Sequence, residues 1–172
     1  MKKILLQIFI VALLPIACIA QNTEWHKYTS AAGHYSINFP GQFTESTEID
    51  SSGATLIKMN LVEYTPDPNT VFMSSYVDFA ASYPADQTVK QILENSRDGA
   101  LASLGVTKST TLNTNLTGDP YIEFSFTGPD FVGKDRIYVI NKVQYSIICI
   151  FAHDAGLNPN TDKFIQSFKH NN

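Results

Sequence analysis

The 172-residue sequence has only two cysteines, one tryptophan and a single long apolar run, which lies at its N-terminus. Cys18 belongs to that run, so Cys149 has no partner for an intramolecular disulfide once the run is removed. Cys149 lies in the apolar segment 145–151, where a thiol ordinarily packs as a small core side chain and not as a nucleophile. No later segment reaches the roughly 20 apolar residues of a membrane-spanning helix, which excludes a polytopic membrane protein.

Positive charge is scarce as well. Without the N-terminal segment that carries Lys2 and Lys3, ten basic residues remain against 16 acidic ones, a formal net charge of −6. Nucleic-acid-binding proteins concentrate positive charge on one face, and anionic membrane surfaces attract the same charge. The balance therefore argues against both kinds of partner, and it is typical of a soluble exported domain.

Recognisable catalytic motifs are missing. The sequence contains no Gly-x-Ser-x-Gly or Ser-x-x-Lys motif and no glycine-rich loop ahead of a helix. No two of its four histidines have the short fixed spacing that is typical of paired metal ligands. We therefore expect no enzymatic activity, no bound metal and no cofactor.

Four residues remain as candidates for a binding site. His153 and Asp154 follow the most apolar predicted strand, at a position where residues leaving a strand can line a cleft. His34 begins another predicted strand and is a candidate to approach them. Tyr76, like Tyr64 and Tyr83, is a candidate for a contact surface, because tyrosine is enriched at interfaces. The simpler interpretation is a solvated His-Asp pair and ordinary tyrosines at the rim of a sheet.

The first 20 residues are predicted to be a signal peptide. Lys2 and Lys3 precede a short apolar run that ends in the small residue Ala20. Cleavage after Ala20 would release a secreted protein, whereas lipidation of Cys18 would leave it anchored, although Pro15 stands where such lipoprotein signals usually have leucine. Either route exports the protein to the periplasm or the medium. Residues 21–172 are then one folded domain.

Apolar periodicity predicts an α+β domain. The pattern of residues 88–104 is that of a helix, with a capping box at Thr88 and Gln91 and a stop at Gly105. A second helix near the C-terminus is capped by Asn158 and turns Phe164 inward. The expected strands are 25–28, 35–39, 43–49, 55–64 and one starting at Val71, then 107–113, 121–127, 133–140 and 144–153.

Short connections between these strands predict a mostly antiparallel sheet. Asn141 and Lys142 form a tight hairpin turn, since asparagine tolerates a positive φ. The strand 144–153 is almost continuously apolar, which indicates that it lies at the sheet centre with cover on both faces. The last helix supplies part of the second covering layer.

Two segments carry a family resemblance. The opening one contains Trp25-x-x-Tyr28, Gly33 and Tyr35-Ser36-Ile37-Asn38-Phe39-Pro40, and the closing one is Phe164-Ile165-x-Ser167-Phe168-Lys169. They resemble the PsbP-like fold family, which includes the photosystem II extrinsic protein PsbP and the Ran-binding Mog proteins. The resemblance implies an antiparallel sheet sandwiched between helices, and an accessory or partner-binding role in place of catalysis. No functional residue of the family carries over to this sequence.

Three functions are compatible with these observations. The leading hypothesis is an exported, non-enzymatic binding or accessory domain that docks on another envelope or secreted protein. The second is a carrier that holds a small apolar molecule between the sheet and the helix at 88–104, in a cavity of about 300 Å³ or more. The third is a hydrolase or metal-dependent enzyme centred on His153 and Asp154. An exposed apolar surface would favour docking, and a cleft with converging polar groups would favour the other two.

Overall fold

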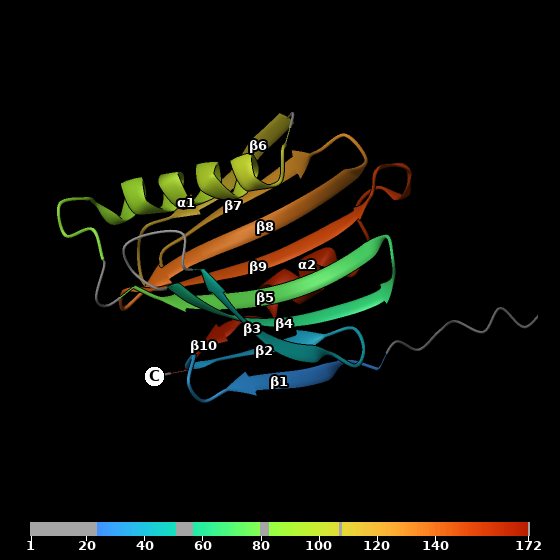
Figure 1. Ribbon diagram of the computed structural model, residues 1–172, viewed down its shortest axis with the longest axis horizontal. Coiled ribbons are helices and arrows are strands. Elements are labelled where there is room, and N and C mark those ends of the chain that lie inside the picture. Colours follow the sequence, from blue (N-terminus) through green and yellow to red (C-terminus); the bar gives the residue numbers. More distant parts are fainter. Residues whose placement is uncertain (1–23, 51–56, 80–82, 107, 172) are drawn as a thin grey trace, which may run out of the picture.

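The computed structural model describes residues 24–50, 57–79, 83–106 and 108–171. The predicted signal peptide, including Cys18, lies outside these residues. Two antiparallel sheets and two helices make up the fold (Figure 1). The larger sheet has, in spatial order, the strands β3 (Thr44–Asp50), β4 (Ile57–Asp67), β5 (Thr70–Asp78), β9 (Val143–Ala152), β8 (Phe131–Ile140), β7 (Tyr121–Thr127) and β6 (Lys108–Asn115).

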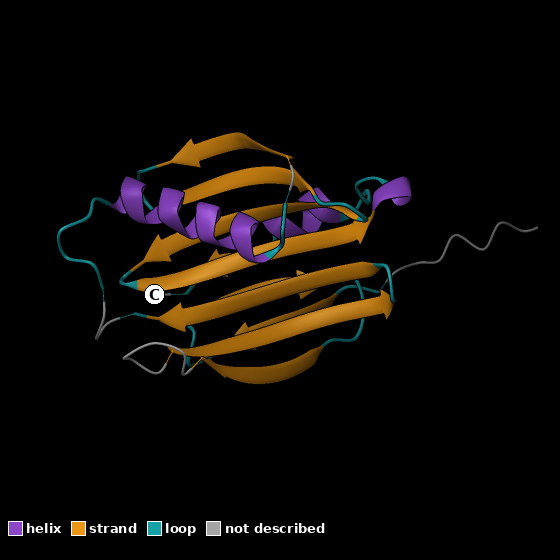
Figure 2. Ribbon diagram, turned by 45° about the horizontal axis from the view of Figure 1, so that its top comes forward, coloured by secondary structure: helices purple, strands orange, loops and turns teal. Residues whose placement is uncertain are grey.

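A smaller sheet and the two helices cover the faces of the larger sheet. Helix α1 (Val89–Ser103) lies over β7 and β8 on one face (Figure 2). The other face packs against helix α2 (Thr161–Gln166) and a small sheet of the strands β1 (His26–Ser30), β2 (Tyr35–Phe39) and β10 (Lys169–His170). The fold is therefore the predicted α+β sandwich. In the described ranges, no helix combines the length and the apolar character needed to cross a bilayer.

The predicted central strand is confirmed. β9 is the fourth strand of seven, and its side chains enter two separate cores. Ile147 and Cys149 pack toward the small sheet and α2, whereas Ile148 packs toward α1. The hairpin turn is also confirmed, since Asn141 and Lys142 have φ values of 51° and 68°. Burial of Cys149 raises the pKa of its thiol, in keeping with a core side chain.

The small sheet is a difference from the sequence prediction, which placed all strands in one sheet. β10 contains only two residues, which pair with Ser36 and Tyr35 of β2. β2 is also more deeply buried than a half-buried strand, since all its residues except Asn38 are buried. The Asn38 amide donates a hydrogen bond to the hydroxyl of Ser167, just after α2 (3.0 Å). Pairing between β2 and β10, which lie far apart in the sequence, leaves no local sequence pattern.

Helix α1 follows the sequence prediction closely. The Thr88 hydroxyl accepts from the Gln91 amide (3.3 Å), and the Gln91 side chain accepts from the Thr88 amide (2.8 Å). Gly105 has the expected positive φ of 62°. The last helix is shorter than predicted. It begins at Thr161, and Asn158 instead accepts a hydrogen bond from the Asn160 amide (2.8 Å) in the turn before it.

Gly99 offers a direct test of the helix. A Cβ built at Gly99 meets nothing within 4 Å, and the residue is exposed in the interior of α1. We expect Gly99→Ala to raise the free energy of unfolding by about 1 kcal/mol, because alanine loses less backbone entropy in a helix. Urea denaturation of both proteins measures the change. A destabilised variant would contradict the described environment of Gly99.

Candidate functional site

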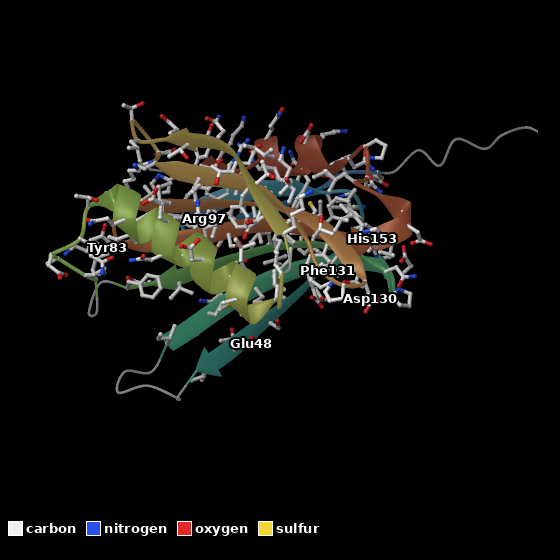
Figure 3. The ribbon with its side chains drawn as sticks, turned by 90° about the horizontal axis from the view of Figure 1, so that it is seen from above. Glu48, Tyr83, Arg97, Asp130, Phe131 and His153 are labelled. Atoms are coloured by element: carbon white, nitrogen blue, oxygen red, sulfur yellow. The ribbon has the colours of Figure 1, made fainter. Side chains whose placement is uncertain are left out.

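His153 and Asp154 lie on the surface at the end of β9. Both belong to a single 3₁₀ turn, η1 (His153–Ala155), and both are exposed. The His153 amide donates to the Asp130 carbonyl (3.1 Å), which ties the turn to the loop before β8. Figure 3 shows His153 beside Asp130 and Phe131, at the far end of the molecule from Tyr83.

His34 is not brought close to this pair. It occupies the turn between β1 and β2 with a φ of 50°, and its side chain is exposed. The neighbouring carbonyl of Gly33 accepts a hydrogen bond from the Tyr145 hydroxyl (3.0 Å). Tyr145 precedes His153 by eight residues along β9, a separation of about 26 Å in an extended strand. His34 and His153 therefore lie at opposite ends of the sheet.

The three candidate tyrosines do not share one surface. Tyr64 packs against Phe72, with ring centroids 6.1 Å apart. Tyr76 lines a polar hollow beside the β1–β2 turn, and Tyr83 lines an apolar groove beside α1. Tyr76 and Tyr83 each remain partly exposed at a concave part of the surface, so these two stay relevant to binding.

The apolar groove, called here the α1-side groove, runs between helix α1 and the strands β3–β5. It consists of two adjoining hollows of about 360 Å³ and about 490 Å³. Phe79 and Gln144 line both and join them. The first hollow is otherwise lined by Tyr83, Pro84, Gln87, Ile92, Asn95, Ser96 and Val139, and the second by Glu48, Ile49, Ile57, Met59 and Val77.

The groove exists because one helix is too narrow for the sheet. An α-helix is about 10 Å wide and neighbouring strands are about 4.8 Å apart, so a single helix running along the strands covers two or three of them. α1 contacts β7 and β8 and does not extend over β3 and β4, where Figure 3 places Glu48. On this side Ile57 and Met59 lie on the same sheet face as Glu48, remain partly exposed and line the second hollow.

Polar contacts hold the walls of the groove in place. The Ser96 hydroxyl of α1 donates to the Gln144 side chain of β9 (2.6 Å). The Phe79 amide donates to the Lys142 carbonyl (3.0 Å), and the Lys142 ammonium lies 5.9 Å from the centroid of the Tyr83 ring. The groove is therefore formed before any partner binds, which lowers the entropic cost of binding.

Directly beneath α1 the core is filled. Ile92 and Leu93 pack on apolar side chains of β7, β8 and β9, and Leu93 is fully buried. The space between α1 and the sheet is therefore filled, where the carrier hypothesis needs an enclosed cavity. The two hollows lie beside the helix and open to solvent. Among the lining residues Glu48 is the one with a full charge, which makes the groove apolar with an acidic rim.

The described residues include one carboxyl with a strongly raised pKa and no cluster of metal-ligating side chains. Nowhere in these ranges do three or more His, Cys, Asp or Glu side chains gather so as to hold a metal ion. Asp135 is the carboxyl with a strongly shifted pKa, raised to about 7 by burial, but it is 1% exposed beneath α1 and out of reach of a substrate.

Sequence reasoning found Tyr76 and Tyr83 but not the groove. One signal for it was present: Ile57, Met59 and Leu61 share a strand face in a segment for which the sequence offers no second helix. That signal says which face is apolar, but not that the face stays open, because the lateral position of α1 depends on contacts with β7 and β8.

Comparison with known proteins places the fold. The sequence matches no protein-family model and none of the curated proteins searched. Among solved structures, the chain is similar to cyanobacterial PsbP (CyanoP) from Synechocystis sp. PCC 6803, with a TM-score of 0.55 and 12% sequence identity. The match covers 86% of this chain and 93% of the other. The chain therefore has a PsbP-like fold, as the two sequence segments suggested.

Proposed function

We propose that this protein is an exported, non-enzymatic binding domain that docks on another envelope or secreted protein through the α1-side groove. The partner would insert an apolar segment flanked by basic residues. Its apolar side chains would contact Ile57, Met59 and Phe79, and its basic flank would face Glu48. The predicted signal peptide and the acidic balance of the chain support an exported location and a basic partner.

The observation that carries the proposal is the apolar groove beside α1, over the part of the large sheet that the helix does not reach. A monomeric domain ordinarily covers such a surface, and contiguous apolar patches on soluble proteins mark interaction sites. Ile57 and Met59 are partly exposed in this groove, on the same sheet face as Glu48. The preformed walls suit a peptide segment laid along a hydrophobic groove.

A small-molecule carrier is the second candidate. The two hollows are large enough for an apolar ligand, but both are open, whereas carriers bury most of the surface of their ligand. Native mass spectrometry of the purified protein distinguishes the two. A co-purifying apolar molecule that disappears in Met59→Glu would favour the carrier.

Photocrosslinking in the native cell tests docking. With p-benzoylphenylalanine in place of Ile57, which lies on the same face as Met59, we expect a discrete crosslinked protein. With the second change Met59→Glu we expect its yield to fall about tenfold, because a carboxylate is costly in an apolar contact. Leu112, 49% exposed on the opposite edge strand β6, provides the matched control position. Equal crosslinking from both positions, or no effect of Met59→Glu, would refute docking at this groove.

A further inference from the structure

A second concave site lies on the opposite face of the sheet, beside the small sheet. It is a hollow of about 550 Å³ between β1, the β1–β2 turn and the strands β3–β5, called here the tyrosine hollow. Its volume lies within the range of small-ligand sites, about 300–1,000 Å³. The lining residues are Tyr28, Thr29, Ser30, Ala31, Ala32, Glu45, Ser46, Thr47, Asn60, Leu61 and Tyr76.

Two half-exposed tyrosine rings form one wall of this hollow and are held rigidly. Tyr28 and Tyr76 both pack against the fully buried Tyr35, with ring centroids 5.7 Å and 6.1 Å from it. Tyr35 is fixed by a hydrogen bond between its hydroxyl and that of Ser74 (3.1 Å). Gly33 lets the turn approach closely, since a Cβ there would lie 2.8 Å from the Tyr76 ring.

The remaining lining is dense in groups that both donate and accept hydrogen bonds. The Tyr28 hydroxyl donates to Glu45 Oε2 (3.1 Å), and the Thr47 hydroxyl donates to Asn60 Oδ1 (3.3 Å). The Ser30 hydroxyl accepts from the Gly33 amide (2.9 Å). Hydroxyl and amide groups of this kind complement a ligand that is itself rich in hydroxyls.

Charge narrows the class of ligand. Glu45 is the one charged side chain among the lining residues, and no lysine, arginine or histidine lines the hollow. An anionic ligand would meet repulsion and no cationic partner, while a simple ammonium ion would leave most of the volume and most of the hydroxyls unused. A neutral polyhydroxyl ligand uses all three features: the rings, the hydroxyl groups and the carboxylate.

We propose that the tyrosine hollow binds a saccharide. One sugar face lies against Tyr28 or Tyr76, where C–H groups meet the negative face of the aromatic ring. Glu45 accepts hydrogen bonds from adjacent sugar hydroxyls, which are strengthened by its charge. The tyrosine hollow is separate from the α1-side groove, so its test does not depend on the outcome of the docking test.

Saturation-transfer NMR with the full exported chain tests the proposal. The probes are glucose, galactose, mannose, N-acetylglucosamine and their β-linked disaccharides at millimolar concentration, with choline and inorganic phosphate as competing classes. We expect transfer to at least one sugar. We expect a loss of affinity of about tenfold or more in Glu45→Gln, which removes the charge that strengthens the hydrogen bonds from the sugar, and in Tyr28→Leu, which removes the aromatic ring. Neither substitution alters a buried side chain.

Glu48→Gln is the matched control, because Glu48 lies on the same strand and its side chain lines the α1-side groove instead. It should bind sugar like the parent protein. No transfer to any sugar, binding of choline or phosphate in preference to sugar, or an equal loss in Glu48→Gln would each overturn the proposal.

Discussion

The substitution Asp135→Asn is expected to change the free energy of unfolding in a pH-dependent way. At pH 8 its effect should be more stabilising than at pH 4 by about 4 kcal/mol. Asp135 lies on the α1 face of β8, between Phe124 and Ile148 of the neighbouring strands, and is 1% exposed. Burial raises the pKa of its carboxyl from 3.8 to about 7, although Ser146 donates to it from 3.0 Å.

The direction of the effect follows from the two protonation equilibria. Below about pH 4 the carboxyl is protonated in both the folded and the unfolded chain, so it contributes no pH dependence. Between about pH 4 and pH 7 the unfolded chain releases this proton while the folded chain keeps it, which lowers the stability of the parent protein by about 1.4 kcal/mol per pH unit. Above pH 7 both states are ionised and the loss is complete.

Urea denaturation of parent and variant across this pH range provides the measurement. Asparagine keeps an oxygen that can accept from the Ser146 hydroxyl, so the variant should fold. Asp130→Asn is the control, because Asp130 is exposed in the loop before β8. A difference between parent and Asp135→Asn that stays constant with pH would show that the carboxyl is not kept protonated by burial.

Glu123→Gln is expected to cost about 3 kcal/mol of stability. Glu123 lies on β7 with its side chain 8% exposed, and two cations of β8 depend on it. Arg136 Nε donates to Glu123 Oε2 (2.6 Å), and Lys134 Nζ lies 2.9 Å from Glu123 Oε1. Neutralising Glu123 leaves both cations with less compensation in a largely buried place, although Asp162 still pairs with Lys134 (2.8 Å).

Glu94→Gln serves as the matched control for this prediction. It breaks the exposed pair of Lys90 and Glu94 on α1, in which the nitrogen and oxygen lie 3.8 Å apart. Exposed pairs of this kind contribute at most about 0.5 kcal/mol. Guanidinium denaturation measures the loss in free energy of unfolding for each variant. We expect the loss in Glu123→Gln to be several times that in Glu94→Gln. Similar losses would show that the buried ion pairs of Glu123 contribute no more to stability than an exposed pair.

Local features of the fold were predictable from the sequence. The capping box at Thr88 and Gln91, the stop at Gly105 and the positive φ of Asn141 each depend on residues within a few positions of one another. Their backbone conformations follow from local sterics and hydrogen bonding. The central place of β9 was predictable for a related reason, since an uninterrupted apolar strand needs cover on both faces.

The candidate sites were predictable only in part. Tyr76 was singled out for its residue type, and it lines the tyrosine hollow, but its companions Tyr28 and Glu45 were not. Tyr28, Glu45 and Tyr76 lie on β1, β3 and β5, respectively. These strands come together through β3–β4–β5 pairing and through the packing of the small sheet. The proximity of His153 and Asp154 was visible in the sequence, whereas their exposure and their distance from His34 depended on the ends of the sheet at which they lie.

The order of the amino acids alone decided which segments become strands and helices and which of their faces are apolar. Tertiary structure decided where those faces lie: that the last strand joins the first two in a separate sheet, and that α1 lies over β7 and β8 and leaves a groove beside it. The reason is the sequence separation of the residues that make the contacts. Periodicity reports the few neighbours within a turn or a pleat, while lateral placement depends on contacts between residues far apart in the chain.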